Sequence, residues 1–408
     1  MSGSNAQALR KLMITVAAMG LAGTVFTSVM PDFLHNQMGV EGDVRGALEV
    51  PREAPGLLQI ALVAALAGLA KFRSLTLTFA VGAVAFVGLA FVGDSLPLFV
   101  VFMVLWSASA HLFMPLRDAV AMELAGNERR GYVLGTAGAY RAVGLIAGTG
   151  LVWLVLTQLE LGFKTLFLIT AIVLAAGVLA TERLPILASD RPVEGAPRQG
   201  ALRLFVDLLA HRPEYRLYYL LSALFGARKQ IFLTFAPWLL VSSYDQKAPQ
   251  LALGFGISAA VGIALRPLLG RWIDRCGERA VIVAESAMVA VMCAAYAVVP
   301  LVAPRGVAII VLYGLYVLDD ILFFLWIART TYLSRISRSV REVAPAVALG
   351  GTIDHVASML VPLGAGIMWT AIGPWSVFLA AAAIALASLL AAFAMPREPC
   401  DNVREGNR

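Results

Sequence analysis

The chain has 408 residues, of which 60% are hydrophobic and 14% are charged, and its mean hydropathy is +0.80. Soluble domains are about 45–50% apolar and about 25% charged, and a soluble core does not grow large enough to absorb this excess, so most of the surface must face lipid. The net charge of +6 does not indicate nucleic-acid binding, because the basic residues occur in short runs between apolar segments.

Apolar segments long enough to cross a membrane, for which a helix needs about 20 residues, follow one another along the chain. Six precede a polar stretch: 12–34, 50–70, 75–93, 97–122, 132–156 and 163–180. Six more follow it: 217–241, 251–273, 280–302, 307–331, 343–372 and 375–395. The sequence therefore predicts an all-α polytopic membrane protein with twelve transmembrane helices in two six-helix bundles. We expect the bundles at 1–181 and 217–396, a cytoplasmic linker at 182–216 and a cytoplasmic tail at 397–408.

The distribution of lysine and arginine predicts the orientation, because cytoplasmic loops carry an excess of both. With the N-terminus inside, 23 of the 32 basic residues lie on the inner side, and only Arg45, Lys164, Lys247 and Arg305 lie on the outer side. The bias repeats from loop to loop, and one missed helix would scramble it. We therefore expect both termini in the cytoplasm and the chain in a bacterial inner membrane.

Several ionisable side chains fall inside the predicted helices, where a charge is costly and therefore indicates function. At a rise of about 1.5 Å per residue, they lie near the middle of the membrane in both halves. The candidates for solute binding are Arg141, Arg228, Lys229, Tyr316, Asp320 and His111. The candidates for a coupling proton are Glu53, Asp319, Asp320 and Asp354, because burial favours the neutral form of a carboxyl group.

Arg141 and Arg228 come from different halves, and two uncompensated arginines would favour an anionic or carboxylate-bearing solute. Asp319, Asp320 and Asp354 leave a second interpretation open, in which aspartates neutralise the arginines and the solute is zwitterionic or cationic.

Some of these residues also have purely structural interpretations. Glu49 and Arg52 could form a local pair within one helix, His111 could be a satisfied buried histidine, and Glu285 stands near a helix start. The aromatic side chains around Tyr316 could serve packing alone.

The most specific local pattern follows the eighth predicted helix. Residues 270–279 read G-x-x-x-D-R-x-G-x-R, formed by Gly270, Asp274, Arg275, Gly277 and Arg279. This pattern resembles the loop signature of the major facilitator superfamily, which lies between helices 2 and 3 and recurs between helices 8 and 9. The resemblance covers nearly the whole chain and implies a secondary transporter whose cytoplasmic gate includes these five residues and the nearby Arg266. A plain positive-inside loop is the alternative interpretation.

Two stretches depart from the family pattern. Residues 68–73, at the first of the two loop positions, contain no acidic residue. The segment 132–156 contains glycines but not the proline that drug–proton antiporters carry in the fifth helix.

The predicted function is therefore secondary active transport of a small solute by alternating access, with a proton as the candidate coupling ion. A multidrug or metabolite efflux antiporter of the same fold and a transport-inactive membrane sensor or scaffold are the alternatives. The chain has no phosphate-binding loop, so we expect no ATPase activity. Its three cysteines are scattered, so we expect no metal site. We also expect no enzymatic activity and no cofactor. We expect a monomer whose partners are the solute, protons and the lipid bilayer.

Overall fold

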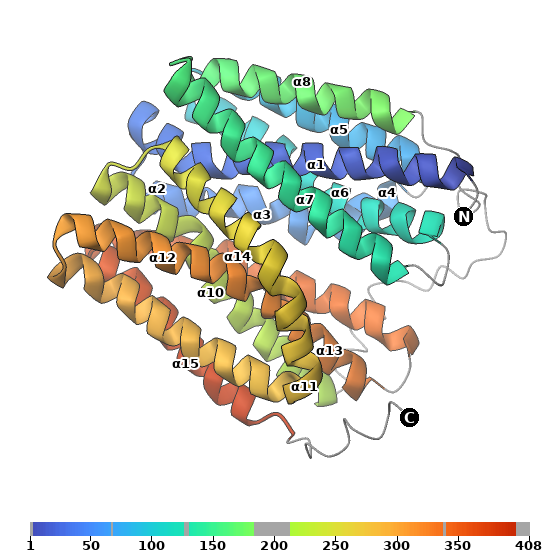
Figure 1. Ribbon diagram of the computed structural model, residues 1–408. Helices are drawn as coiled ribbons and strands as arrows, with labels where there is room; N and C mark the ends of the chain where they lie inside the picture. Colours follow the sequence, from blue (N-terminus) through green and yellow to red (C-terminus); the bar gives the residue numbers. More distant parts are fainter. Residues whose placement is uncertain (1–2, 67, 126–129, 183–212, 338–339, 397–408) are drawn as a thin grey trace. The chain divides into compact units, whose positions relative to one another are not determined.

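The computed structural model describes residues 3–66, 68–125, 130–182, 213–337 and 340–396 (Figure 1). The predicted tail at 397–408 and most of the predicted linker lie outside these residues. The first half contains α1 (Gly3–Asp32), η1 (Phe33–Gln37), α2 (Gly42–Ala47), α3 (Glu49–Leu57), α4 (Gln59–Ala65), α5 (Lys71–Leu89), α6 (Leu96–Ala125), α7 (Arg130–Trp153), η3 (Leu154–Gln158) and α8 (Phe163–Glu182). The second half contains η5 (Pro213–Tyr215), α10 (Arg216–Tyr244), α11 (Ala248–Val302), α12 (Arg305–Phe323), η6 (Phe324–Trp326), α13 (Ile327–Ile336), α14 (Val340–Ala371) and α15 (Pro374–Phe393).

Helices dominate because a segment in lipid must satisfy its backbone hydrogen bonds internally. Within the described residues, nine helices are long and apolar enough to cross a membrane. One of them, α11, has 55 residues, far more than one crossing needs, and Gly277 interrupts it with a φ of 75° and a ψ of 160°. Because of this kink α11 counts as two crossings, which raises nine to ten, and α10 and the broken α2–α4 segment bring the total to twelve. The predicted all-α fold with twelve membrane helices is confirmed.

The chain divides into two compact units, and the first consists of Met1–Val40, Pro51–Ala196 and Asp245–Ile263. Within it, α1 packs against α6, α7 and α8, and α5 packs against α6 and α8 (Figure 1). The α1–α7 contact is close, because a Cβ atom at Gly144 would collide with the carbonyl of Ala17 and one at Gly148 would lie 2.8 Å from that of Leu21. Small residues permit such close approach of membrane helices.

The second unit consists of Glu41–Val50, Pro197–Tyr244 and Ala264–Arg408. Within it, α10 packs against α12, α13, α14 and α15, and α2 packs against α14 (Figure 1). A Cβ atom at Gly46 of α2 would collide with the carbonyl of Pro362, and one at Gly366 of α14 would lie 2.7 Å from that of Gly42. A short segment from the first half of the sequence is therefore built into this unit.

The helices differ from the predicted ones in two places. The predicted helix 50–70 is broken into α3 and α4 at Leu58, whose ψ of 3° is not helical, and α3 contains Pro51 and Pro55. Both prolines lie before the break, inside α3, where each removes a backbone donor. The predicted helices 251–273 and 280–302 remain two helices, which meet at a kink at Gly277 without a longer loop between them.

Candidate solute and coupling site

Three consecutive polar residues of α10 organise the buried charges of the second unit. Arg228 donates Nη1 to Asp319 of α12, Lys229 donates Nζ to Asp354 of α14 at 2.7 Å, and Gln230 contacts a third partner. All three side chains are buried. Successive residues of a helix point about 100° apart, because a turn takes 3.6 residues, so one short stretch can reach several neighbouring helices.

The third partner is Glu49, at the start of α3. Gln230 donates Nε2 to Glu49 Oε2 at 2.8 Å and to Thr234 Oγ1 at 3.2 Å. Glu49 is fully buried and also accepts Nη1 of Arg45 at 2.5 Å. Arg52, which the sequence places one turn after Glu49, forms an ion pair with Glu53 at 2.5 Å.

A further ion pair is almost fully buried within the second unit. Arg329 of α13 donates Nη2 to Glu285 of α11 at 2.8 Å, and the side chains are 7% and 2% exposed. Sequence reasoning counted Arg329 among the inner-side basic residues and Glu285 as structural. The signal that could have found them is their apolar surroundings within predicted helices.

Three cations surround the ring of Phe225 on α10. The guanidinium carbons of Arg329 and Arg228 lie 4.4 Å and 5.8 Å from the ring centroid, and Lys229 Nζ lies 5.8 Å from it. Ring faces attract cations, most strongly where water is excluded. Phe225 therefore holds three cations close together while each cation keeps its own carboxylate.

The charges of this group, which we call the Phe225 cluster, balance one another. Its cations are Arg228, Lys229 and Arg329, and their respective partners are Asp319, Asp354 and Glu285. Of the two interpretations left open for Arg228, the ion pair with Asp319 fits the one in which an aspartate neutralises the arginine. A balanced buried cluster responds to the gain of one proton, because that gain leaves one cation unpaired.

Two other predicted residues lie on α12 in the same unit. Tyr316 is buried, and Asp320 is half-buried next to Asp319. Asp320 lies within electrostatic range of Tyr316 and Asp319.

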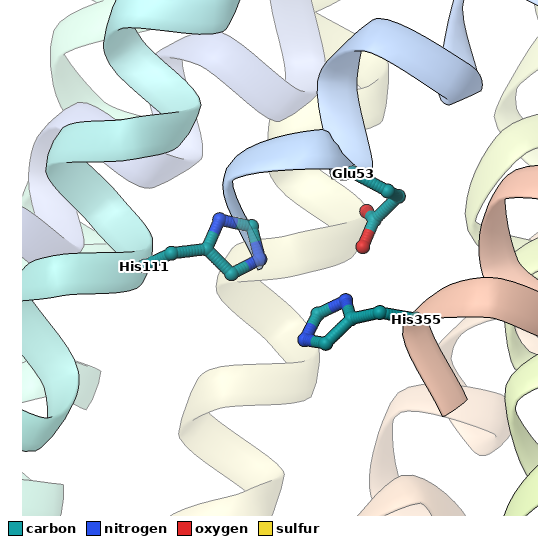
Figure 2. Close-up of side chains that lie close together, drawn as sticks. All are labelled: Glu53, His111 and His355. Carbon is teal, nitrogen blue, oxygen red and sulfur yellow. The ribbon is translucent and has the colours of Figure 1, made fainter. Parts of the chain in front are cut away.

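The remaining predicted residues belong to the first unit. Figure 2 shows Glu53 on α3 and His111 on α6, and it also labels His355 of α14, which belongs to the second unit. A carboxylate oxygen of Glu53 and a ring nitrogen of His111 lie within 4.8 Å of each other. Nδ1 of His111 lies 2.9 Å from the carbonyl of Ser107, and Arg141 is exposed on α7.

The signature at 270–279 lies in the second unit, around the break in α11. Asp274 and Arg275 are exposed. The Asp274 carboxylate has no hydrogen-bond or ion-pair partner among the residues that the structure describes. Arg279 Nη2 donates to the carbonyl of Phe393 at 3.3 Å, and the Arg266 guanidinium lies 5.9 Å from the Phe324 ring. A Cβ atom at Gly270 would meet nothing within 4 Å.

Twelve membrane helices with buried, paired charges define a membrane transporter, and comparison with known proteins assigns the family. The chain belongs to the Major Facilitator Superfamily, whose sequence model matches residues 12–318. It is therefore a secondary transporter of a small solute and an integral membrane protein with multiple spans, not an enzyme.

Solved structures are similar to this chain in fold. A variant of the nucleoside transporter NupG has a TM-score of 0.79 at 18% identity, covering 96% of this chain and 100% of that one. Another NupG structure has a TM-score of 0.77 at 16% identity with the same coverage. A bacterial homologue of the human lysosomal transporter Spinster, inward-facing and unoccupied, has a TM-score of 0.69 at 15% identity, covering 96% and 95%. No match was found among curated proteins.

Proposed function

We propose that this protein moves a small polar solute by alternating access and couples its movement to a proton through the Phe225 cluster. We place it in a bacterial inner membrane with both termini in the cytoplasm. In this proposal the loop residues Asp274, Arg275 and Arg279, with Gly270 and Gly277, help to hold the cytoplasmic side closed in the outward-facing state, and Arg266 assists them.

The observation that carries the proposal is the set of three ion pairs around one ring. Each pair joins two different helices: α10 to α12, α10 to α14, and α11 to α13. A buried ion pair is weak evidence for stability, because apolar side chains of similar volume would do as well or better. Charges inside membrane helices are usually functional, so their retention favours transport over a scaffold.

Reconstituted vesicles with a trapped pH indicator test the proposal. A panel of neutral, anionic, zwitterionic and cationic solutes is added, and it includes nucleosides because two of the similar solved structures are of one nucleoside transporter, NupG. We expect one solute class to drive proton movement in the wild type. The variant Asp319→Asn removes this movement, whereas Asp245→Asn, at an exposed position between α10 and α11, retains it.

Other outcomes select among the alternatives. Proton movement opposite to the solute and confined to cationic, lipophilic compounds indicates an efflux antiporter. Solute flux that is unchanged in Asp319→Asn contradicts the proton coupling. Specific solute binding without any flux indicates a sensor of the same fold.

A further inference from the structure

We infer that Glu285 is a second carboxylate partner of Arg228 and that it takes over the guanidinium when Asp319 binds a proton. The inference rests on the proposed proton coupling and extends it to a carboxylate outside the predicted site. It also indicates what kind of solute the protonated site would favour.

Both arginines have spare buried donors. Arg228 is 3% exposed and donates Nη1 to Asp319, and its Nη2 has no hydrogen-bond partner among the described residues. Arg329 donates Nη2 to Glu285, and its Nε and Nη1 have none there either. A buried donor without a partner costs about 1–3 kcal/mol, and more when the group is charged. The present pairing therefore satisfies only part of each guanidinium, and another arrangement can use the spare donors.

Glu285 is placed to take part in such an arrangement. It lies within electrostatic range of both Arg228 and Asp319, and it is itself buried. Arg228 and Arg329 share the ring of Phe225, with their guanidinium carbons 5.8 Å and 4.4 Å from its centroid. Arg228 can therefore change carboxylates by turning its side chain while it stays beside the ring.

The charges can be followed through the step. Before protonation, Arg228 with Asp319 and Arg329 with Glu285 make two neutral pairs. A proton then forms an O–H bond on the carboxylate of Asp319, and Arg228 loses its charged acceptor. The two oxygens of Glu285 can each accept from one arginine, since an ionised carboxylate offers about four acceptor positions.

The protonated arrangement has one carboxylate between two arginines and therefore a net charge of +1. In a poorly hydrated interior this charge is strongly felt, and it favours the entry of an anionic group. The solute that binds together with the proton would accordingly carry a carboxylate or a similar anionic group. Loss of the proton returns Arg228 to Asp319 and removes the attraction.

Other charged and titratable groups surround this step on each packed element. They are Tyr218 and Lys229 on α10, Cys293 and Tyr296 on α11, Asp320, Tyr313 and Tyr316 on α12, and Asp354 on α14.

Infrared titration of the purified, solute-free protein tests the inference. The carbonyl band of a protonated carboxyl group is followed against pH and is assigned to Asp319 by its loss in Asp319→Asn. The double variant Glu285→Gln/Arg329→Gln removes one negative and one positive charge, so a merely structural pair leaves the midpoint unchanged. We expect the midpoint to fall by about one pH unit or more, a tenfold loss in proton affinity, because Arg228 then has no second acceptor.

A matched control is available on the same helices. Glu278 of α11 and Arg335 of α13 form a more exposed ion pair at 3.1 Å, and Glu278→Gln/Arg335→Gln should keep the wild-type midpoint. Glu285→Asp, which keeps the charge on a shorter side chain, should give a smaller downward shift and serves if the double variant does not fold.

Two results would overturn the inference. An Asp319 band with the wild-type midpoint in both Glu285 variants removes the exchange and leaves proton coupling in place. The absence of any band that depends on Asp319 removes both the exchange and the coupling proton, while the flux assay still decides whether the protein transports.

Discussion

At the scale of single residues, the buried cations of α10 are held by carboxylates on neighbouring helices. Lys229 and Asp354 illustrate the balance, because their side chains are 10% and 19% exposed and their atoms are 2.7 Å apart. Removing one partner of such a pair leaves a charge without compensation, whereas removing both can be nearly neutral.

We therefore expect Lys229→Gln to lower the free energy of unfolding by about 2–3 kcal/mol, and Lys229→Gln/Asp354→Asn to restore most of the loss. The measurement is the midpoint of thermal unfolding in detergent. Lys71 and Glu123 provide the control, because their ion pair is 3.2 Å long with both side chains about one quarter exposed. Lys71→Gln should cost less than about 1 kcal/mol. Equal losses in the two lysine variants would show that burial does not decide the effect.

Sequence reasoning found the depth of the buried charges on α10, α12 and α14 but not their partners. Depth follows from counting residues along a helix, so Arg228, Asp319 and Asp354 could be placed in the same layer. Partners depend on the rotation of each helix about its axis, which a periodic apolar pattern fixes poorly when the helix is apolar all round. Gln230 was missed because an uncharged side chain gives no signal of cost, although it binds Glu49.

At the scale of elements, close packing replaces polar contacts where α2 meets α14. Gly42 and Gly46 on α2 face Pro362, Gly366 and Trp369 on α14 with no room for a Cβ atom at either α2 position. Membrane helices gain little from hydrophobic association, so contact of this kind depends on small residues.

We expect Gly46→Ala to destabilise the protein by about 1–3 kcal/mol, because the added methyl group collides with the backbone carbonyl of Pro362, which cannot rotate away. Gly314→Ala on α12 is the matched control, since its Cβ atom would meet nothing within 4 Å. Alanine is the better helix former, so this change should be neutral or stabilising by up to about 1 kcal/mol. The thermal unfolding midpoints of the two variants compare them directly. A neutral Gly46→Ala would mean that α2 and α14 adjust easily.

Most elements were predictable because a run of about 20 apolar residues has few alternatives to a membrane helix. The break at Leu58 within the second predicted helix was not predictable, because hydropathy does not register the backbone angles of a single residue. The inclusion of α2 in the second unit could not be predicted either, since close contact through Gly46 leaves no periodic trace in the sequence.

At the scale of the whole molecule, the bias of basic residues is a property of all the loops together. No single loop determines the orientation. The excess of 23 basic residues on the inner side over four on the outer side predicts that the N-terminus lies in the cytoplasm. The orientation matters for the mechanism, because the Arg329–Glu285 pair then lies on the cytoplasmic side of the Arg228–Asp319 pair.

The native cysteine Cys276 makes the orientation testable, because it is exposed in the loop that we place in the cytoplasm. A membrane-impermeant maleimide should label Cys276 only after the membrane is permeabilised. In a Cys276→Ser background, Asp94→Cys and Asp245→Cys, both at exposed positions, should react in intact cells, because the same basic bias places them outside. Cys293 is buried and should stay unlabelled in either case. Labelling of Cys276 in intact cells, with Asp94→Cys and Asp245→Cys protected, would contradict the predicted orientation and place the loop around Cys276 outside the cell.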